Sequence, residues 1–297
     1  MVIENHYFSL GQLAGELLRF LPDTAYLRLM YRRYHKTRLN LANPEKFTEK
    51  LQWLKLHDRH PLYSRLVDKY EVKQIVSEKI GSQYVVPLLG VWDAPNAINW
   101  EKLPDKFVIK TTHYGGSSGV IVCKNKQKLD IPKAIKKLEG NFKLDAYLYG
   151  REWPYKNVKP RIIAEQLIEI EGINDIPDFK WYCFNGKPTY CQVIQNRSEH
   201  ETIDFFDNNW QHCNFIGLNP RANNAENPPC QPSCLQEQLE IASILSKGIP
   251  FVRIDLYEAN GKVYFGEYTF YPGSGLGSFR PSEYDKLLGN MIDLSTV

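Results

Sequence analysis

The 297-residue sequence has no run of 18 apolar residues, and its six cysteines include no CxxC pair. A membrane-spanning helix is therefore not expected. Cys230 and Cys234 in CQPSC resemble only half of a metal site, so free thiols in a reducing cytoplasm are the expectation. The formal net charge of +3 is too small to indicate a nucleic-acid partner. The first residues lack a basic start, a long apolar middle and a small-residue cleavage site, so we expect a protein that is not secreted.

Signatures of several common enzyme classes are missing as well. No GK[ST] opens a helix, so there is no Walker A motif, and no Ser, Cys or His stands in a triad-like arrangement. IDFFD at 203–207 is spaced DxxD rather than DxD. Residues 1–60 are predicted to be helical, whereas a nucleotide-sugar glycosyltransferase would begin with a Rossmann-like half. These features disfavour a glycosyltransferase, which is kept only as a second hypothesis for the function.

Hydrophobic spacing divides the sequence into a helical segment, a small α+β unit and a larger α+β unit. Helical patterns cover residues 8–57 and continue through PLYSRLVDKYEVKQIVSEKIG, which Gly81 ends. Short β-rich runs begin at residue 84, a helix is expected over about 131–149, and Asn185-Gly186 is expected to form a hairpin turn.

Two further stretches have a distinctive composition. TAYLRLMYRRYHK is basic and amphipathic, and we expect it to pack on the core and leave its basic side in solvent. Contact with an anionic membrane surface is the alternative for this helix. The polar stretch at 219–235, rich in Pro and Asn, is expected to form a surface loop.

Residues 251–275, FVRIDLYEANGKVYFGEYTFYPGSG, contain two β-rich runs around a tight turn. Asp255 and Glu267 share a face only if the loop holds an odd number of residues, so we predict a three-residue loop at 259–261 with Gly261 left-handed in a G1 bulge. Two carboxylates on one face repel unless a cation lies between them, and Mg²⁺ takes such oxygens together with substrate phosphates. A metal site is therefore predicted, and a solvated face with ordinary cross-strand pairing is the alternative.

A glycine-rich loop occurs in KFVIKTTHYGGSSGVIV, where one predicted strand delivers Lys110 and the loop at 115–119 leads into another. Backbone N–H groups of such a loop can surround phosphate oxygens, and glycine lets the backbone come close. Lys110 lies within an apolar strand, and a buried ammonium needs an anionic partner. These features indicate an anion-binding loop.

Other predicted strands carry isolated polar residues. Glu165 stands at the end of the apolar run RIIAEQLIEI, where an exposed backbone edge could receive a flat heterocycle. Asp178 and Lys180 share one face of DFKWYCFNG, and VIQNR ends on Arg197. Taken singly, each is more often a charge on an exposed face than a ligand contact.

Taken together, these residues resemble the ATP-grasp superfamily over residues 66 to 280. The matching pieces, in order, are Asp68-Lys69, Lys110 with its glycine loop, Glu165-Gln166-Leu167-Ile168, Asp178-x-Lys180 and Arg253-x-Asp255…Glu267-x-Thr269. More closely, NPEKFTEKLQWLKLHDRHPLYSRLVDKY and FGEYTFYPGSG resemble the TupA-like branch. That branch is associated with teichuronopeptide and capsular polysaccharide biosynthesis, and many of its relatives carry only a loose glycosyltransferase label.

The resemblance implies an α+β fold, the ATP-grasp fold, in which two α+β lobes sandwich ATP after a helical N-terminal segment. It implies a helical segment over 1–65, a small lobe with the glycine-rich loop over 66–160 and a large lobe with a metal-binding hairpin over 161–297.

The implied nucleotide-binding residues come from both lobes. They are Lys69 and Lys110 on phosphates, the loop Gly115, Gly116, Ser117, Ser118 and Gly119 over the β- and γ-phosphates, Glu165 on the adenine amino group with the backbone of Gln166 and Ile168 on the ring edge, and Asp178 on the ribose, with Glu169 or Asp175 as rivals. His113 either contacts the γ-phosphate or packs as an ordinary loop histidine.

The resemblance also implies metal ligands and catalytic residues. Asp255 and Glu267 would hold Mg²⁺, and Thr269 stands where the family usually has Asn, so one of the two metal positions is expected to be looser or completed by water. Lys180 occupies the place of a phosphate-contacting base. Arg253 and Arg197 would stabilise charge on the transferring phosphoryl group or the acyl phosphate.

The implied function is that of a cytoplasmic, ATP- and Mg²⁺-dependent carboxylate–amine ligase that acts through an acyl phosphate. It would join an amino acid or amino sugar to a hexuronic acid, or the roles would be reversed, and the helical segment and the 219–235 loop would select the sugar. Peripheral contact with the inner membrane or with polysaccharide assembly machinery stays open, and no nucleic acid is expected. The alternatives are a glycosyltransferase, another ATP-grasp phosphoryl transfer and a polysaccharide-binding scaffold.

Overall fold

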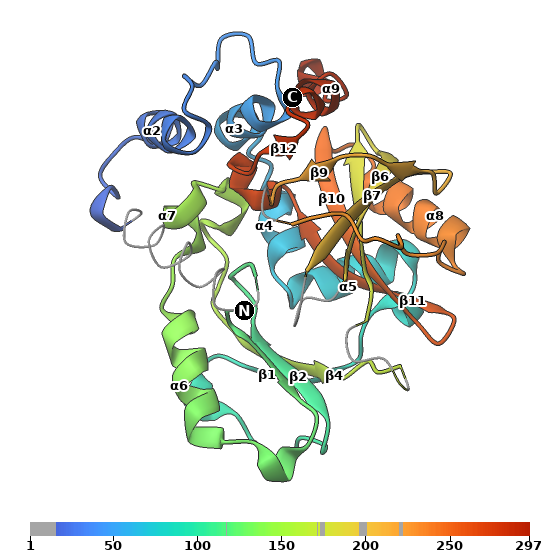
Figure 1. Ribbon diagram of the computed structural model, residues 1–297. Coiled ribbons are helices and arrows are strands. Elements are labelled where there is room, and N and C mark those ends of the chain that lie inside the picture. Colours follow the sequence, from blue (N-terminus) through green and yellow to red (C-terminus); the bar gives the residue numbers. More distant parts are fainter. Residues whose placement is uncertain (1–15, 117, 171, 173–175, 196–200, 220–221) are drawn as a thin grey trace. The chain divides into compact units, whose positions relative to one another are not determined.

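The computed structural model describes residues 16–116, 118–170, 172, 176–195, 201–219 and 222–297. Contacts group the chain into two compact units (Figure 1): unit 1 consists of Met1–Arg59 and Ile170–Val297, and unit 2 of His60–Glu169. The N-terminal helices therefore belong to the same unit as residues 170–297, whereas the sequence led us to expect a separate helical segment over 1–65. The stretch 161–169, expected in the large lobe, belongs to unit 2 because its strand pairs within the small sheet.

Unit 2 contains a four-stranded antiparallel sheet with the strand order β1-β4-β2-β3. Its strands are β1 (Leu88–Trp92), β2 (Phe107–Thr111), β3 (Val120–Cys123) and β4 (Ile162–Gln166). Its helices are α4 (Pro61–Val67), α5 (Glu71–Ile80), α6 (Ile131–Phe142) and α7 (Ala146–Gly150), with the short 3-10 helices η1 (Ser82–Tyr84), η2 (Pro95–Ala97), η3 (Lys126–Lys128) and η4 (Trp153–Tyr155).

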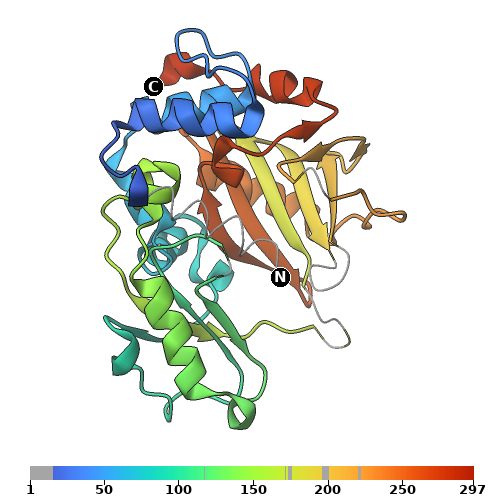
Figure 2. The same cartoon turned by 60° about the vertical axis from the view of Figure 1, so that its left-hand side comes forward.

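One face of the small sheet forms the core of unit 2. Phe107 and Ile109 of β2 pack in one cluster with Leu138 of α6, and Figure 2 shows α6 lying along the sheet. Because side chains alternate along a strand, Lys110 points to the other face. The alternation thus separates the apolar core from the lysine that the sequence singled out.

Unit 1 contains a six-stranded sheet with the order β11-β10-β5-β6-β7-β8 and a two-stranded ribbon of β9 and β12. The strands are β5 (Asp178–Phe184), β6 (Lys187–Gln195), β7 (Thr202–Asp207), β8 (His212–Cys213), β9 (Ile216–Gly217), β10 (Phe251–Ala259), β11 (Lys262–Thr269) and β12 (Phe279–Arg280). The helices are α2 (Asp23–His35), α3 (Phe47–His57), α8 (Leu235–Ser246) and α9 (Glu283–Gly289), with η5 (Pro272–Gly275) and η6 (Leu294–Thr296).

Helices cover both faces of the large sheet. On one face, Trp181 Nε1 donates to Gln238 Oε1 of α8 at 3.0 Å. On the other, Phe47 at the start of α3 packs edge-on against Phe251, with ring centroids 4.8 Å apart. Phe251 and Asp255 have the same parity on β10, so α3 packs on the sheet face that carries Asp255.

The turn between β10 and β11 differs from the predicted loop. Ala259 pairs with Lys262, so the turn consists of two residues, Asn260-Gly261, with φ values of 53° and 70°. Two consecutive positive φ values are the signature of a type I′ turn, for which Asn-Gly is the favoured sequence. The predicted three-residue loop with a G1 bulge at Gly261 is wrong.

The extra residue that puts Asp255 and Glu267 on one face lies in β11 and not in the turn. Asp255 pairs with Glu267 but Leu256 pairs with Phe265, which leaves Gly266 as the extra residue of a β-bulge. A Cβ atom on Gly266 would lie 2.9 Å from the carbonyl oxygen of Asp255, so glycine fits this close approach. The prediction that Asp255 and Glu267 share a face is confirmed, and the bulge is its physical reason.

Three simpler expectations can also be compared with the structure. Asn185 and Gly186 form the predicted hairpin turn, with φ values of 49° and 78° between β5 and β6. All six cysteines lie in the described part of the chain and are free thiols. No helix among the described residues is long and apolar enough to cross a membrane.

Candidate active site

Six of the predicted site residues form one polar cluster on the large sheet. This hairpin cluster consists of Asp178, Lys180, Arg253, Asp255, Glu267 and Thr269. Strand register brings them together: Asp255 on β10 pairs with Lys180 on β5 and with Glu267 on β11, and Arg253 pairs with Thr269. Residues up to 91 positions apart in the sequence (178 and 269) thus share one face.

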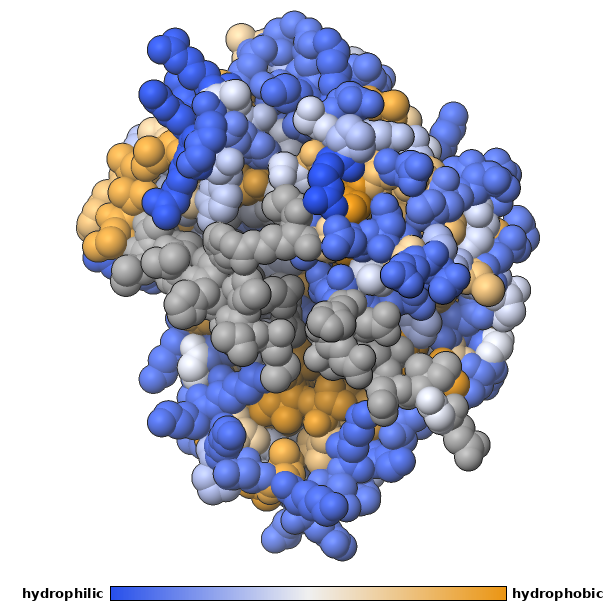
Figure 3. All heavy atoms as spheres, viewed as in Figure 1, coloured by the Kyte–Doolittle hydropathy of each residue, from blue (hydrophilic) through white to orange (hydrophobic). Residues whose placement is uncertain are grey.

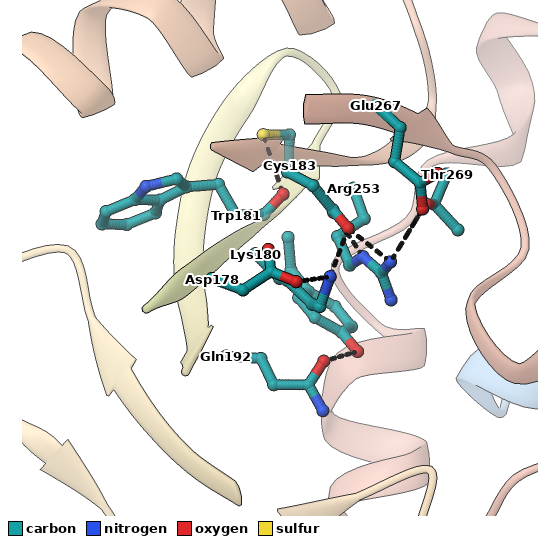
Figure 4. A network of polar contacts seen from close by, with 10 residues as sticks. Asp178, Lys180, Trp181, Cys183, Gln192, Arg253, Glu267 and Thr269 are labelled. Atoms are coloured by element: carbon teal, nitrogen blue, oxygen red, sulfur yellow. Dashed lines mark hydrogen bonds and ion pairs between the residues drawn. The ribbon is translucent and has the colours of Figure 1, made fainter. Parts of the chain in front are cut away.

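Asp255 is the centre of the cluster and is only 1% exposed. Arg253 donates to it through Nε (2.6 Å to Oδ1) and Nη2 (2.7 Å to Oδ2), a bidentate arrangement that fixes the guanidinium. Lys180 Nζ lies 2.7 Å from Asp178 Oδ2 (Figure 4) and 2.5 Å from Asp255 Oδ2. One buried carboxylate therefore orients Arg253 and Lys180, two of the cations that the sequence singled out.

Glu267 and Thr269 form the more open side of the cluster. The Thr269 hydroxyl donates to Glu267 Oε1 at 3.2 Å and accepts from Arg253 Nη2 at 3.0 Å. The Glu267 side chain is 35% exposed, whereas that of Asp255 is buried. Glu267 is thus the carboxylate that a ligand from solvent can reach.

Among the six residues of the cluster, negatively charged groups outnumber positively charged ones. Its three carboxylates, Asp178, Asp255 and Glu267, face two cations, Lys180 and Arg253. Burial raises the pKa of Asp255, and the two cations oppose this rise by favouring the ionised form. Burial alone would lower the pKa of Arg253, but the carboxylates of Asp255 and Glu267 more than offset it, so Arg253 remains charged.

The donor atoms suit a hard cation such as Mg²⁺. Asp255, Glu267 and Thr269 offer carboxylate and hydroxyl oxygens, the ligand type that Mg²⁺ prefers alongside water and phosphate. Among the described residues, no group of three or more His, Cys, Asp or Glu side chains is arranged to hold a metal by itself. An ion bound to Asp255 would share this carboxylate with Arg253.

A second polar cluster lies in unit 2 and consists of Glu165, Lys110 and Lys73. Lys110 Nζ is 2.5 Å from Glu165 Oε2, and Lys73 Nζ of α5 is 2.5 Å from Oε1. Burial alone would raise the pKa of Glu165, but the two lysines outweigh it and hold this pKa below its usual range. This Glu165 cluster confirms that Lys110 has an anionic partner, here a carboxylate of the protein.

Sequence reasoning missed Lys73. The only signal was its position on the amphipathic helix α5, next to the buried Val72 and three residues before the buried Val76. Lys73 also donates to the carbonyl oxygen of Val86 at 2.8 Å, so it links the helix to the segment before β1 as well as to Glu165.

The glycine-rich loop is anchored by α6. Asn141 of α6 donates to Ser118 Oγ at 2.8 Å and also accepts a hydrogen bond from Thr111 Oγ1. A Cβ atom on Gly119 would lie 2.3 Å from Asn141 Oδ1, so only glycine lets the loop pass this side chain. Gly116 has a φ of 74°, the left-handed conformation that glycine favours.

Lys69 and His113 lie beside this loop. Lys69 Nζ donates to the carbonyl oxygen of Tyr114 at 2.7 Å. His113 is 4% exposed and packs against Phe142, with ring centroids 5.8 Å apart. Burial lowers the pKa of His113, which keeps the ring neutral. This environment favours an ordinary packed loop histidine over a contact with the γ-phosphate.

The remaining predicted residues are less constrained. The backbone N–H of Gln166 donates to the carbonyl oxygen of Pro87 at 3.0 Å, and Ile168 follows β4 in a loop. Glu169, a rival for the ribose, forms an exposed ion pair with Lys106. The predicted residues Ser117, Arg197 and Asp175 lie outside the described residues.

A model of the TupA-like ATP-grasp family matches residues 49–293. No curated protein matches the chain. The fold is similar to that of the D-alanine–D-alanine ligase from Bacillus anthracis, with 18% sequence identity, 70% of this chain and 58% of that chain covered, and a TM-score of 0.40. For the D-alanine–D-alanine ligase from Helicobacter pylori the identity is 14%, the coverage 84% of this chain and 70% of that chain, and the TM-score 0.40. For the ATP-grasp ligase PsnB complexed with minimal precursor, Mg and ADP the identity is 12%, the coverage 75% of this chain and 57% of that chain, and the TM-score 0.38.

These solved structures are distant. The chain spans less than two thirds of the B. anthracis ligase and of PsnB, and at these TM-scores the likeness supports no statement about activity. The family match covers most of the sequence and agrees with the expected α+β fold. The chain belongs to the TupA-like ATP-grasp family.

Proposed function

We propose that the protein is an ATP-dependent carboxylate–amine ligase that acts through an acyl phosphate. The observation that carries this proposal is the hairpin cluster, in which a buried carboxylate orients Arg253 and Lys180 while Glu267 stays accessible. Fixed cations beside a carboxylate-rich, net negative edge suit a metal-bound polyphosphate, because the ion neutralises the edge and the cations meet the phosphates. The cofactors are ATP and Mg²⁺.

The small sheet supplies the features expected of a nucleotide surface. Leu88 and Val122 are 40% and 53% exposed and lie on the same sheet face as Lys110 and Glu165, as the strand register indicates. Figure 3 shows apolar side chains gathered over this sheet. An apolar surface next to lysines suits a purine ring next to phosphates, and the glycine-rich loop offers backbone N–H groups to the phosphates.

The chain's own residues have distinct tasks in this chemistry. A carboxylate resists attack by an amine because its leaving group is poor, and transfer of the γ-phosphoryl group makes an acyl phosphate that the amine can open with release of phosphate. Arg253 and Lys180, held by Asp255, stabilise the negative charge that develops on the transferring group. Bound Mg²⁺ would neutralise the phosphates. Closure of the loop at 115–119 would keep water from the acyl phosphate.

The substrates follow from the family's association with surface polysaccharides and not from any contact in the chain. We propose that an amino acid or amino sugar is joined to a hexuronic acid, in the cytoplasm, with either partner supplying the carboxylate. Helix α3 supports a role of the N-terminal segment in this selection, since it packs on the sheet face that carries Asp255. Peripheral contact with the membrane stays a separate proposal, and the exposed side of α2 is the feature that supports it.

The test is calorimetric titration of a non-hydrolysable ATP analogue with and without Mg²⁺. Wild type should bind with an affinity that depends on Mg²⁺, and Glu267→Ala should lose most of that dependence. Glu240→Ala, an exposed acid on α8, is the matched control and should behave as wild type. A screen of ADP release across uronic acids and amino acids would then identify the substrates. Binding of a sugar nucleotide without binding of ATP would overturn the ligase proposal in favour of a glycosyltransferase.

A further inference from the structure

Helix α2 and the turn before it have a buried and an exposed side. Tyr26, Leu27, Met30 and Tyr31 are buried in one apolar cluster, and Leu18 and Leu21 pack against the same cluster. The buried positions of α2 fall on one side of the helix because they are spaced by three, four and five residues. The core of unit 1 therefore fixes which side of this segment faces outward.

The outward side carries nine exposed residues that are either basic or large and apolar. A few small or polar residues lie between them. The basic and apolar residues are Arg19, Arg28, Arg32, Arg33, Lys36 and Arg38, and Leu17, Phe20 and Leu29. Arg28, Leu29 and Arg32 follow at spacings of one and three, so they lie on one side of α2, and Lys36 caps the C-terminal end of the helix. We refer to these nine residues as the α2 surface.

The α2 surface is strongly basic. Glu16 is the one exposed acid between residues 16 and 38, and the half-buried Asp23 is paired with Arg59 at 2.9 Å. Within the described chain, none of the ion pairs involves any of the six basic residues. Six cations therefore face solvent within 20 residues of a chain whose total net charge is only +3.

The apolar members make this surface unusual. Phe20 is 84% exposed, Leu17 71% and Leu29 48%, and the guanidinium of Arg19 lies over the Phe20 ring at 4.8 Å from its centroid. In Figure 3, apolar side chains lie beside strongly hydrophilic ones over α2 and the segment before it. A polyanion such as a uronate-containing saccharide would meet the cations but would leave Leu17 and Leu29 in water. An anionic bilayer meets both kinds of residue, since its headgroups attract cations and its interface accepts Leu and Phe.

We propose that the α2 surface docks the protein on an anionic lipid membrane, with the basic residues on the headgroups and Leu17, Phe20 and Leu29 inserted at the interface. The inference rests on this surface alone and is independent of the ligase activity, so either can fail without the other.

The test is flotation of the full chain with vesicles of phosphatidylcholine alone or mixed with phosphatidylglycerol. Wild type should bind the mixed vesicles, release them at high salt and ignore the neutral ones. The triple change Arg28→Gln, Arg32→Gln, Arg33→Gln should weaken binding about 100-fold, since each cation near an anionic surface contributes roughly fivefold. The pair Phe20→Ser, Leu29→Ser should weaken it about tenfold or more.

A matched control removes the same charge elsewhere. Lys128, Lys133 and Lys136 are exposed lysines in and just before α6, and their triple replacement by glutamine should leave vesicle binding unchanged. Equal loss in both triple variants would overturn the proposal, because net charge alone would then explain the binding. Binding of wild type to polygalacturonate but not to anionic vesicles would also overturn it and would assign the surface to a polyanionic saccharide. Circular dichroism and urea unfolding check that each variant is folded.

Discussion

Replacing Lys73 by methionine removes one of the two ammonium groups that hold Glu165 and keeps most of the side-chain volume. The Lys73 side chain is 14% exposed and that of Glu165 7%, and Nζ lies 2.5 Å from Oε1. Removing one partner of a buried pair costs about 3–5 kcal/mol when the remaining charge is left uncompensated. Here Lys110 remains on the other oxygen, so we expect Lys73→Met to lower the free energy of unfolding by about 1–3 kcal/mol.

Glu165→Gln should be more destabilising than Lys73→Met. It leaves two buried ammonium groups facing a neutral amide, so the expected loss is about 3–5 kcal/mol. In the double variant one of those ammonium groups is gone as well, so the double loss should be smaller than the sum of the single ones. Lys79→Met on the exposed side of the same helix is the control and should change stability by less than about 0.5 kcal/mol.

Urea unfolding at neutral pH, repeated toward acid pH, measures these differences. The depressed pKa of Glu165 means that its contribution is complete above about pH 4.3, the usual pKa of a free glutamate, and is lost as the pH falls through its folded-state pKa. Without Lys73 that folded-state pKa rises, so the acid loss should begin at a higher pH. The reasoning is refuted if Lys73→Met behaves like Lys79→Met, or if Glu165→Gln is the milder change.

Three further outcomes are expected. Gly266→Ala should lower the free energy of unfolding in urea by about 1–3 kcal/mol, because its Cβ would lie 2.9 Å from the Asp255 carbonyl oxygen. Gly140→Ala lies within α6, where an added Cβ meets no atom within 4 Å, so it should raise the free energy of unfolding by about 0.5–1 kcal/mol. Equal effects of the two changes would contradict this. The ring of His113 should titrate by NMR below about pH 6.5, and stability should fall as the pH drops below that value, a slope that His113→Gln should reduce. EDTA should abolish Mg²⁺-dependent nucleotide binding without changing the urea unfolding curve, because Arg253 already compensates the charge of Asp255. A lower urea midpoint in EDTA would instead show that the metal stabilises the fold.

The hairpin shows both the reach and the limit of sequence reasoning. The expectation that one extra residue between Asp255 and Glu267 puts both on one face is confirmed, because side chains alternate along each paired strand. The position of the odd residue was wrong, although Asn260-Gly261 is the strongest short signal for a two-residue turn. A glycine inside a strand pattern, Gly266, was the signal for a bulge in the strand.

The pairing of side chains could not be predicted in the same way. Arg253 and Asp255 were expected to serve a phosphoryl group and a metal, but the structure joins them to each other. Lys73 was missed because its partner, Glu165, lies 92 positions further along the chain (165 − 73) and no local pattern connects them. Parity and hydrophobic period constrain faces, whereas ion pairs depend on how elements distant in sequence pack.

The two clusters share an arrangement that bears on how an ATP-grasp chain can fold without its ligands. In each, a buried carboxylate is held by two cations of the protein, Asp255 by Arg253 and Lys180, and Glu165 by Lys73 and Lys110. A lysine or arginine intended for a phosphate would otherwise be desolvated with no counter-charge, at a cost of several kcal/mol. The carboxylate offsets that cost before a ligand arrives and keeps each cation in a fixed position. A phosphate or metal ion that bound either cluster would compete with this internal partner, so its binding would exchange one set of charge contacts for another.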